Sequence, residues 1–176
     1  MSTDISVVRI AVDGAVAKFV QDGLARLPAD ASKMRELGLL LRRVRDAWLA
    51  GGAINEPVRR DSDAMTVFAK HVADARALPS TGSGLLLVTI VVAAHGELAT
   101  VSDASAAEEL RRALEAAAYR DDIVAVDVVA TGIATLPPAM IRIPTSLAGK
   151  IICKSCGAPF PGELVSCPHC GAPAVA

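Results

Sequence analysis

The chain has 176 residues, a formal net charge of -1, 52% hydrophobic residues and only 3% aromatic residues. This length suits one main domain of about 150 residues and a small C-terminal module. A net charge close to zero lacks the dense positive field that a nucleic-acid partner needs, and few aromatic side chains are available for base stacking. Nucleic-acid binding is therefore not favoured.

The chain also lacks the sequence features of secretion and membrane insertion. Residues 1–9 contain no basic stretch followed by an apolar run and a small-residue cleavage site. The longest apolar run, residues 85–94, is about half the length of a membrane-spanning helix. We therefore expect a cytoplasmic protein without a membrane segment, where cysteines serve more often as metal ligands than in disulfides.

Three helices are predicted in the N-terminal half. Apolar residues recur at three- and four-residue spacing over residues 8–27, which is typical of one helical face, and Pro28 would end this helix. A second helix is predicted over residues 30–48, with the pair Gly51-Gly52 just beyond its end. A third helix is predicted over residues 61–78, before a loop rich in glycine and serine.

The pattern then changes to one typical of strands. Residues 85–94 and 123–131 are continuous apolar runs rich in β-branched side chains, as in strands buried on both faces. Between them a capping box predicts a fourth helix over residues 105–117. This order favours a parallel pair with a right-handed crossover, although a short strand at residues 97–100 would instead form a hairpin with the first strand. So narrow a sheet needs cover from the helices or from a second copy of the chain.

These elements predict an α+β fold with an N-terminal helical segment, a small strand-helix-strand sheet and a C-terminal zinc ribbon. Residues 132–149 contain three prolines and predict a linker with room for one brief strand at residues 140–143. Such a linker favours two parts that unfold separately. The predicted domain organisation is a main domain over residues 1–131 (helices within 7–78, strand-helix-strand over 85–131), a linker over 132–149 and a ribbon over 150–176.

The C-terminal segment carries the strongest functional signal. Its four cysteines form two Cys-x-x-Cys pairs, which are the predicted ligands of one zinc ion: Cys153, Cys156, Cys167 and Cys170. Gly157 and Gly171 follow the pairs, where a tight turn needs a positive φ. Four thiolates complete a tetrahedral shell and leave no open position for water, so the spacing predicts a structural zinc site and not a catalytic one.

Other interpretations of this segment are weaker. A redox role would need a reactive thiolate near the start of a helix, and neither pair opens a recognisable helix. His169 lies inside the second pair, where it would ligate only by displacing a cysteine, so we expect it to face solvent. Nucleic-acid-binding ribbons use basic and aromatic side chains, whereas Phe160 is the only aromatic residue of this segment.

The strand block resembles a known family. Residues 86–98 read Leu-Leu-Val-Thr-Ile-Val-Val-Ala-Ala-His-Gly-Glu-Leu, and a helical segment and residues 122–129, Asp-Ile-Val-Ala-Val-Asp-Val-Val, follow. This is similar to the family called domain of unknown function fifteen-seventeen, over residues 5–131 in all, and its members carry a valine-rich strand ending in Ala-x-Gly-Glu-Leu. The resemblance implies no enzymatic activity and no catalytic residues. This chain differs from those members in its zinc ribbon and in lacking a membrane segment.

No catalytic constellation is evident elsewhere. The sequence His95-Gly96-Glu97 follows a strand, where active sites are often found, but no third group completes a triad. We therefore expect a non-catalytic zinc-binding adaptor or regulatory protein that binds a protein partner and is able to self-associate. The alternatives are a nucleic-acid-binding ribbon protein and a thiol redox sensor that acts through the four cysteines.

Overall fold

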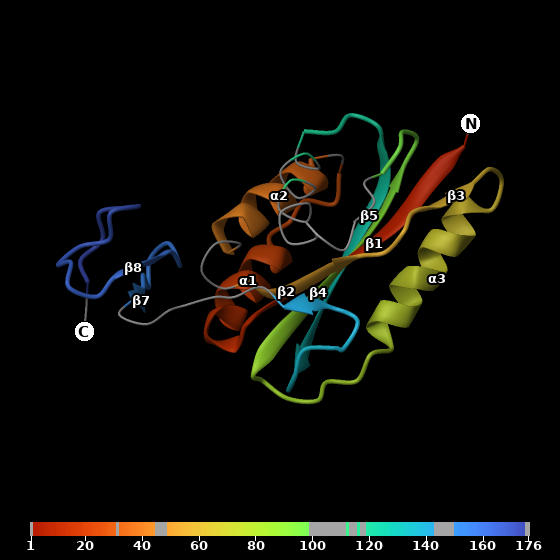
Figure 1. Cartoon of the computed structure of the whole chain (residues 1–176). Helices are drawn as coiled ribbons and strands as arrows, with labels where there is room; N and C mark the ends of the chain where they lie inside the picture. The colour runs from red at the N-terminus through yellow and green to blue at the C-terminus, as the bar shows by residue number, and fades with distance from the viewer. Residues whose placement is uncertain are drawn as a thin grey trace.

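In the computed structural model, the described residues are 2–30, 32–44, 49–98, 112, 116, 119–142 and 150–174. They contain a main domain with helices on both faces of a six-stranded sheet, and a small two-stranded sheet near the C-terminus (Figure 1). The fold class is α+β, as predicted, but the sheet is wider than expected and several elements differ.

The main sheet is antiparallel at every pairing. Its strands are β1 (Thr3–Asp13), β2 (Leu49–Ile54), β3 (Val58–Arg60), β4 (Leu85–Ala94), β5 (Ile123–Ile133) and β6 (Ile141–Arg142). Their order is β5-β4-β1-β2-β6, and β3 pairs with β1 beside β2. Strand β1 is therefore central, with β4 along one side and both β2 and β3 along the other.

Helices cover both faces of this sheet (Figure 1). They are the short 3-10 helix η1 (Gly14–Val16), α1 (Ala17–Ala25), α2 (Lys33–Val44) and α3 (Ala64–Arg76). On one face, Val20 of α1 and Leu37 of α2 pack with Ile10 and Ile90 of the sheet. On the other face, α3 packs through a smaller cluster that includes Phe68 and Val91. The sheet thus lies between two separate apolar cores.

The predicted first helix is wrong for its N-terminal part. Residues 3–13 form the central strand β1, and only Ala17–Ala25 form an α-helix. Strand β1 is covered on both faces, so it carries apolar residues at consecutive positions such as Val7 and Val8. Apolar and polar residues therefore do not alternate along β1. The apolar residues of β1 and α1 together have the three- and four-residue spacing of one long helical face.

The second helix is confirmed from Lys33 to Val44. Its predicted end at residues 45–48 lies outside the described residues. The pair Gly51-Gly52 does not follow the helix as a cap but lies within β2. A Cβ atom on Gly51 would lie 2.6 Å from the Leu136 side chain and 2.9 Å from the Ile141 backbone carbonyl, so these two close approaches explain this glycine. The third predicted helix is confirmed as α3, and a loop follows it.

Both predicted strands exist, but their expected parallel pairing is wrong. Strands β4 and β5 are antiparallel neighbours over their whole length. Strand β4 is buried on both faces as expected, whereas most residues of β5 are half-exposed because β5 lies at the sheet edge. Glu97 and Leu98 are not in a strand. The fourth helix over residues 105–117 lies outside the described residues except for Arg112 and Ala116, which are helical.

The main sheet continues into the segment that the sequence predicts as a linker. Strand β5 ends at Ile133, and Ile141–Arg142 form β6, which pairs with β2 at the opposite edge. The brief strand expected at residues 140–143 is thus present, and Met140 is buried beside Ile133. Among the residues that the structure describes, no helix is long and apolar enough to cross a membrane.

Candidate metal centre

The C-terminal module is a short hairpin followed by a second turn. Strands β7 (Lys150–Ile152) and β8 (Pro159–Pro161) pair antiparallel, and each Cys-x-x-Cys pair closes a tight turn. The Gly157 N–H donates to the Cys153 carbonyl at 2.8 Å, and the Gly171 N–H donates to the Cys167 carbonyl at 2.8 Å. Both glycines have positive φ, 72° and 73°, as the spacing predicts.

These two turns bring the four predicted ligands together. The sulfur atoms of Cys153, Cys156, Cys167 and Cys170 all lie within 4.8 Å of one another. Two Sγ–Sγ distances are 3.6 Å for Cys153 and Cys170 and 3.7 Å for Cys156 and Cys167. Sulfurs bound tetrahedrally to one zinc at about 2.3 Å would be about 3.8 Å apart. The arrangement therefore fits one tetrahedral metal ion held by four thiolates.

The surroundings of the thiols differ within the group. In the metal-free chain, backbone N–H groups, that of Cys156 foremost, lower the pKa of Cys153 to about 6. Burial raises the pKa of Cys156 to about 12. A divalent cation among the four sulfurs would oppose this effect of burial, because it stabilises every thiolate that it touches. Metal binding and loss of the remaining thiol protons are therefore coupled.

The surface of the ribbon includes two exposed apolar side chains. Phe160 is buried with Cys153 and Cys167 in the ribbon core, so its ring is not available to an external ligand. Leu164 and Val165 lie between the two cysteine pairs with 40% and 86% of their surface exposed. Backbone hydrogen bonds fix this loop: the Ala174 N–H donates to the Val165 carbonyl and the Leu164 N–H to the Pro161 carbonyl.

His169 is exposed, as predicted, and does not belong to the cysteine group. The other candidate histidine, His95, lies in the turn after β4, where its Nδ1 is 3.3 Å from the Thr3 hydroxyl. The side chain of Glu97 is exposed, and its backbone carbonyl accepts a hydrogen bond from Arg120 at 2.9 Å. His95 and Glu97 thus lie in a polar cluster at one end of the sheet, and neither belongs to the cysteine group.

The centre of this polar cluster is Asp4, which the sequence did not single out. Both of its carboxylate oxygens accept hydrogen bonds from Arg59, at 2.7 and 3.2 Å, and the Leu98 N–H adds another at 3.3 Å. The hydrogen bond from Arg59 is the main reason that the pKa of Asp4 lies below its usual value. Arg59 is 55 residues from Asp4 in sequence, and no local pattern signals such a pair.

A second ion pair closes the same end of the sheet. Arg120 donates to both oxygens of Asp122, at 2.9 and 2.7 Å, which lowers the pKa of this carboxyl group. A Cβ atom at Gly96 would collide with the Asp122 carboxylate, so a larger residue at this position would displace that carboxylate from Arg120. Asp4 and Asp122 are thus each bound to an arginine, which is typical of a structural polar network.

Comparisons with protein families, with curated proteins and with solved structures find no match to this chain. The family resemblance over residues 5–131 therefore has no support beyond the residues that suggest it. The structure does place two residues of that segment. Gly96 lies against the Asp122 carboxylate. The Leu98 N–H donates to Asp4, and the Leu98 side chain packs on the main core.

Proposed function

We propose that this protein is a non-catalytic adaptor in the cytoplasm, in which one structural zinc ion shapes the ribbon and the ribbon binds a protein partner. The observation that carries this proposal is the exposed apolar loop at Leu164 and Val165, held between the two cysteine pairs. Exposed apolar side chains on a rigid, metal-closed loop are suited to insertion into a pocket of another protein.

The donor set supports a structural role for the metal. Four thiolates favour zinc over harder cations, and they fill its tetrahedral shell. So small a hairpin cannot build a core of its own, because its buried cluster consists of Cys153, Phe160 and Cys167 alone among the described residues. A bound zinc would take the place of that core. The zinc would thus hold Leu164 and Val165 in place without contacting substrate.

The ribbon surface favours a protein partner over nucleic acid. Its charged residues are Lys150, Lys154 and Glu163, which leave a net charge too small for strong phosphate binding. The one aromatic ring of the ribbon is buried, so it cannot stack on a base. Apolar contact through Leu164 and Val165 is the interaction that remains.

The experiment compares partner capture by matched variants. A proximity-labelling enzyme fused to the chain should mark a reproducible set of proteins in cells, and Leu164→Ser/Val165→Ser should remove members of that set. Glu163→Ser is the control, because Glu163 is exposed on the same loop but contributes no apolar surface. Equal labelling by the double variant and the control would show that the ribbon loop is not a binding surface.

A thiol redox sensor is the second candidate. Cys170 is exposed and its sulfur lies 3.6 Å from that of Cys153. A peroxide able to reach Cys170 would take two electrons from this pair of thiols, form a disulfide and leave the metal with two ligands fewer. Zinc release at micromolar peroxide, reversed by a dithiol, would favour this function, and retention of zinc under those conditions would exclude it.

A further inference from the structure

Strand β5 has one side without a partner. It pairs with β4 on one side, and among the residues that the structure describes no strand pairs with the other. Two hydrogen bonds identify the outward groups: the Gly132 carbonyl accepts from the Thr81 N–H at 3.0 Å, and the Val128 N–H donates to Asp127 Oδ1 at 2.7 Å. Alternate residues of a strand present their backbone groups to the same side. The backbone N–H and C=O groups of Val126 and Ala130 therefore also point away from β4.

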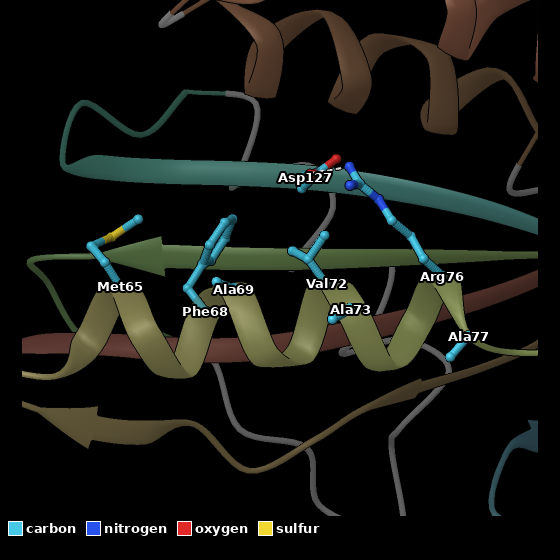
Figure 2. Close-up of a pocket in the computed structure, with 8 residues that line it drawn as sticks. All are labelled: Met65, Phe68, Ala69, Val72, Ala73, Arg76, Ala77 and Asp127. Carbon is cyan, nitrogen blue, oxygen red and sulfur yellow. Dashed lines mark hydrogen bonds and ion pairs between the residues drawn. The ribbon is translucent and has the colours of Figure 1, made fainter.

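An apolar groove runs beside this strand. It has a volume of about 670 Å³ and lies between α3 and β5, with Asp127 as its residue from the strand. In Figure 2 the side chains of Met65, Phe68, Val72 and Arg76 point from α3 toward β5. The groove is hollow because small residues, Ala69, Ala73 and Ala77, line it along the helix. Extended peptides add as strands to exposed sheet edges, and neighbouring pockets select their alternate side chains.

The groove carries no net charge. Among the described residues that line it, the ionised ones are Arg76 and Asp127, and these bind each other at 2.9 Å. Met65 at its other end is 48% exposed, so its apolar side chain is accessible to a ligand there. The charge and the lining both match an uncharged, apolar occupant.

We propose that this groove binds an extended segment of a protein partner, which adds as a new strand to the outer edge of β5 between Val124 and Ala130. Every second side chain of such a strand points to the α3 face. Large apolar side chains at those alternate positions would fill the space over the alanines of α3. This second surface goes beyond the ribbon loop of the proposed function, because it would let the adaptor hold two partners at once.

A second copy of the chain fits the groove less well. If β5 paired with β5 of another copy, the side chains entering the groove would be those of Ala125, Asp127 and Val129, because these positions share the face of Asp127. They are too small to fill it. In a register centred on Asp127, the pairing would also bring two Asp127 carboxylates together, and like charges across a strand pair are unfavourable.

Asp127 also makes the edge selective. Its Oδ1 occupies the Val128 N–H, which an added strand would need for its own carbonyl. The Arg76 guanidinium holds the same carboxylate through Oδ2. Asp127 therefore competes with any incoming strand and protects the edge from unspecific pairing, as charged residues do on other edge strands.

The test uses a displayed library of random seven-residue peptides selected on the intact protein. Enriched peptides should carry large apolar residues at alternate positions, and a labelled peptide from this set should bind in a fluorescence anisotropy titration. Ala73→Glu should raise its Kd by about tenfold or more, which is about 1.4 kcal/mol. Thr66→Glu is the matched control, because Thr66 is exposed on α3 but does not line the groove. Asp127→Ala should tighten binding by freeing the Val128 N–H.

Several outcomes would overturn this assignment. One is the failure of any peptide to be enriched, and another is an enriched set without alternation. Equal Kd values for Ala73→Glu and Thr66→Glu, with unchanged melting curves, would show that the groove is not the peptide-binding site. That result would leave the proposal for the ribbon loop untouched. A wild-type dimer in sedimentation that Ala73→Glu converts to a monomer would assign the edge to a second copy. Val165→Ser should not alter peptide binding to the groove. The groove and the ribbon loop are therefore tested by different variants, and one proposal can fail without the other.

Discussion

The ring of Phe19 in α1 lies against Gly157 in the first cysteine turn: a Cβ atom built on Gly157 would be 2.5 Å from Phe19 Cδ2. Ile152 of the ribbon also packs against the main core cluster. The ribbon therefore touches the main domain beside its metal ligands, whereas the proline-containing segment before it predicts two parts that unfold separately. The contact favours coupling between the metal site and α1.

Two glycines allow this contact to be measured. Gly157 and Gly171 have nearly equal φ values, 72° and 73°, but nothing lies within 4 Å of a Cβ atom at Gly171. Gly157→Ala and Gly171→Ala should share a backbone strain of about 1–2 kcal/mol. Gly157→Ala should lower the melting temperature further, because its methyl group must also displace the Phe19 ring.

A double-mutant cycle separates this contact from other effects. Phe19→Ala should relieve the additional cost of Gly157→Ala but should leave the cost of Gly171→Ala unchanged. If both glycine variants melt alike in both backgrounds, the ring of Phe19 does not hold the ribbon in solution.

The metal content is the most direct prediction. The purified protein should contain one zinc per chain, because its four cysteines complete one tetrahedral shell. Elemental analysis in a reducing buffer measures this ratio, and Cys167→Ser should abolish stoichiometric binding. A ratio near zero for the wild-type protein would contradict the site.

Removal of zinc should unfold the ribbon and leave the main sheet folded. Most of the folding free energy of so small a module comes from metal binding, whereas Ile10, Ile90 and Leu37 keep their own core. After chelation, amide hydrogen exchange should become fast in β7 and β8 and stay slow in β1 and β4. Because Phe19 touches the ribbon, residues around it in α1 should also lose protection. Fast exchange throughout β4 would instead mean that the main core depends on zinc.

Asp4 should make stability depend on pH in the acid range. Its pKa is lowered from 3.8, mainly by the hydrogen bond from Arg59. A carboxyl group with a lowered folded-state pKa stabilises the protein above its unfolded pKa, and this stabilisation is lost as pH falls through the lowered value. Asp4→Asn should therefore lower the free energy of unfolding by about 1–2 kcal/mol near neutral pH. The loss should lie at the low end of this range, because Arg59 is 62% exposed and solvent screens its charge.

Urea unfolding at neutral pH and at about pH 2.5, below the usual Asp pKa, tests this assignment. The difference in unfolding free energy between wild type and Asp4→Asn should shrink in acid. Lys18 and Asp22 form an exposed ion pair, so Asp22→Asn is a control that should change little at either pH. A difference that stays constant between the two pH values would show that the charge of Asp4 is not what matters.

The sequence by itself determined the elements whose signal is local. The cysteine spacing specified the ribbon and its two positive-φ glycines, because a metal turn is built within a few residues. The apolar run of β4 and the amphipathic stretch of α3 specified a buried strand and a helix in the same way.

The tertiary structure decided what depends on contacts between distant segments. Residues 3–13 form the central strand, and helices cover both faces of the sheet. Because both faces of this strand are buried, its sequence lacks the alternation of apolar and polar residues that would have identified it as a strand. Position 51 in β2 is a glycine because the Leu136 side chain occupies the space that a Cβ atom would need. The antiparallel order, the Asp4–Arg59 pair, the open edge of β5 and the contact of Phe19 with Gly157 all join residues far apart in the chain. Such pairs are selected by packing and charge in three dimensions, for which a single sequence carries no periodic signal.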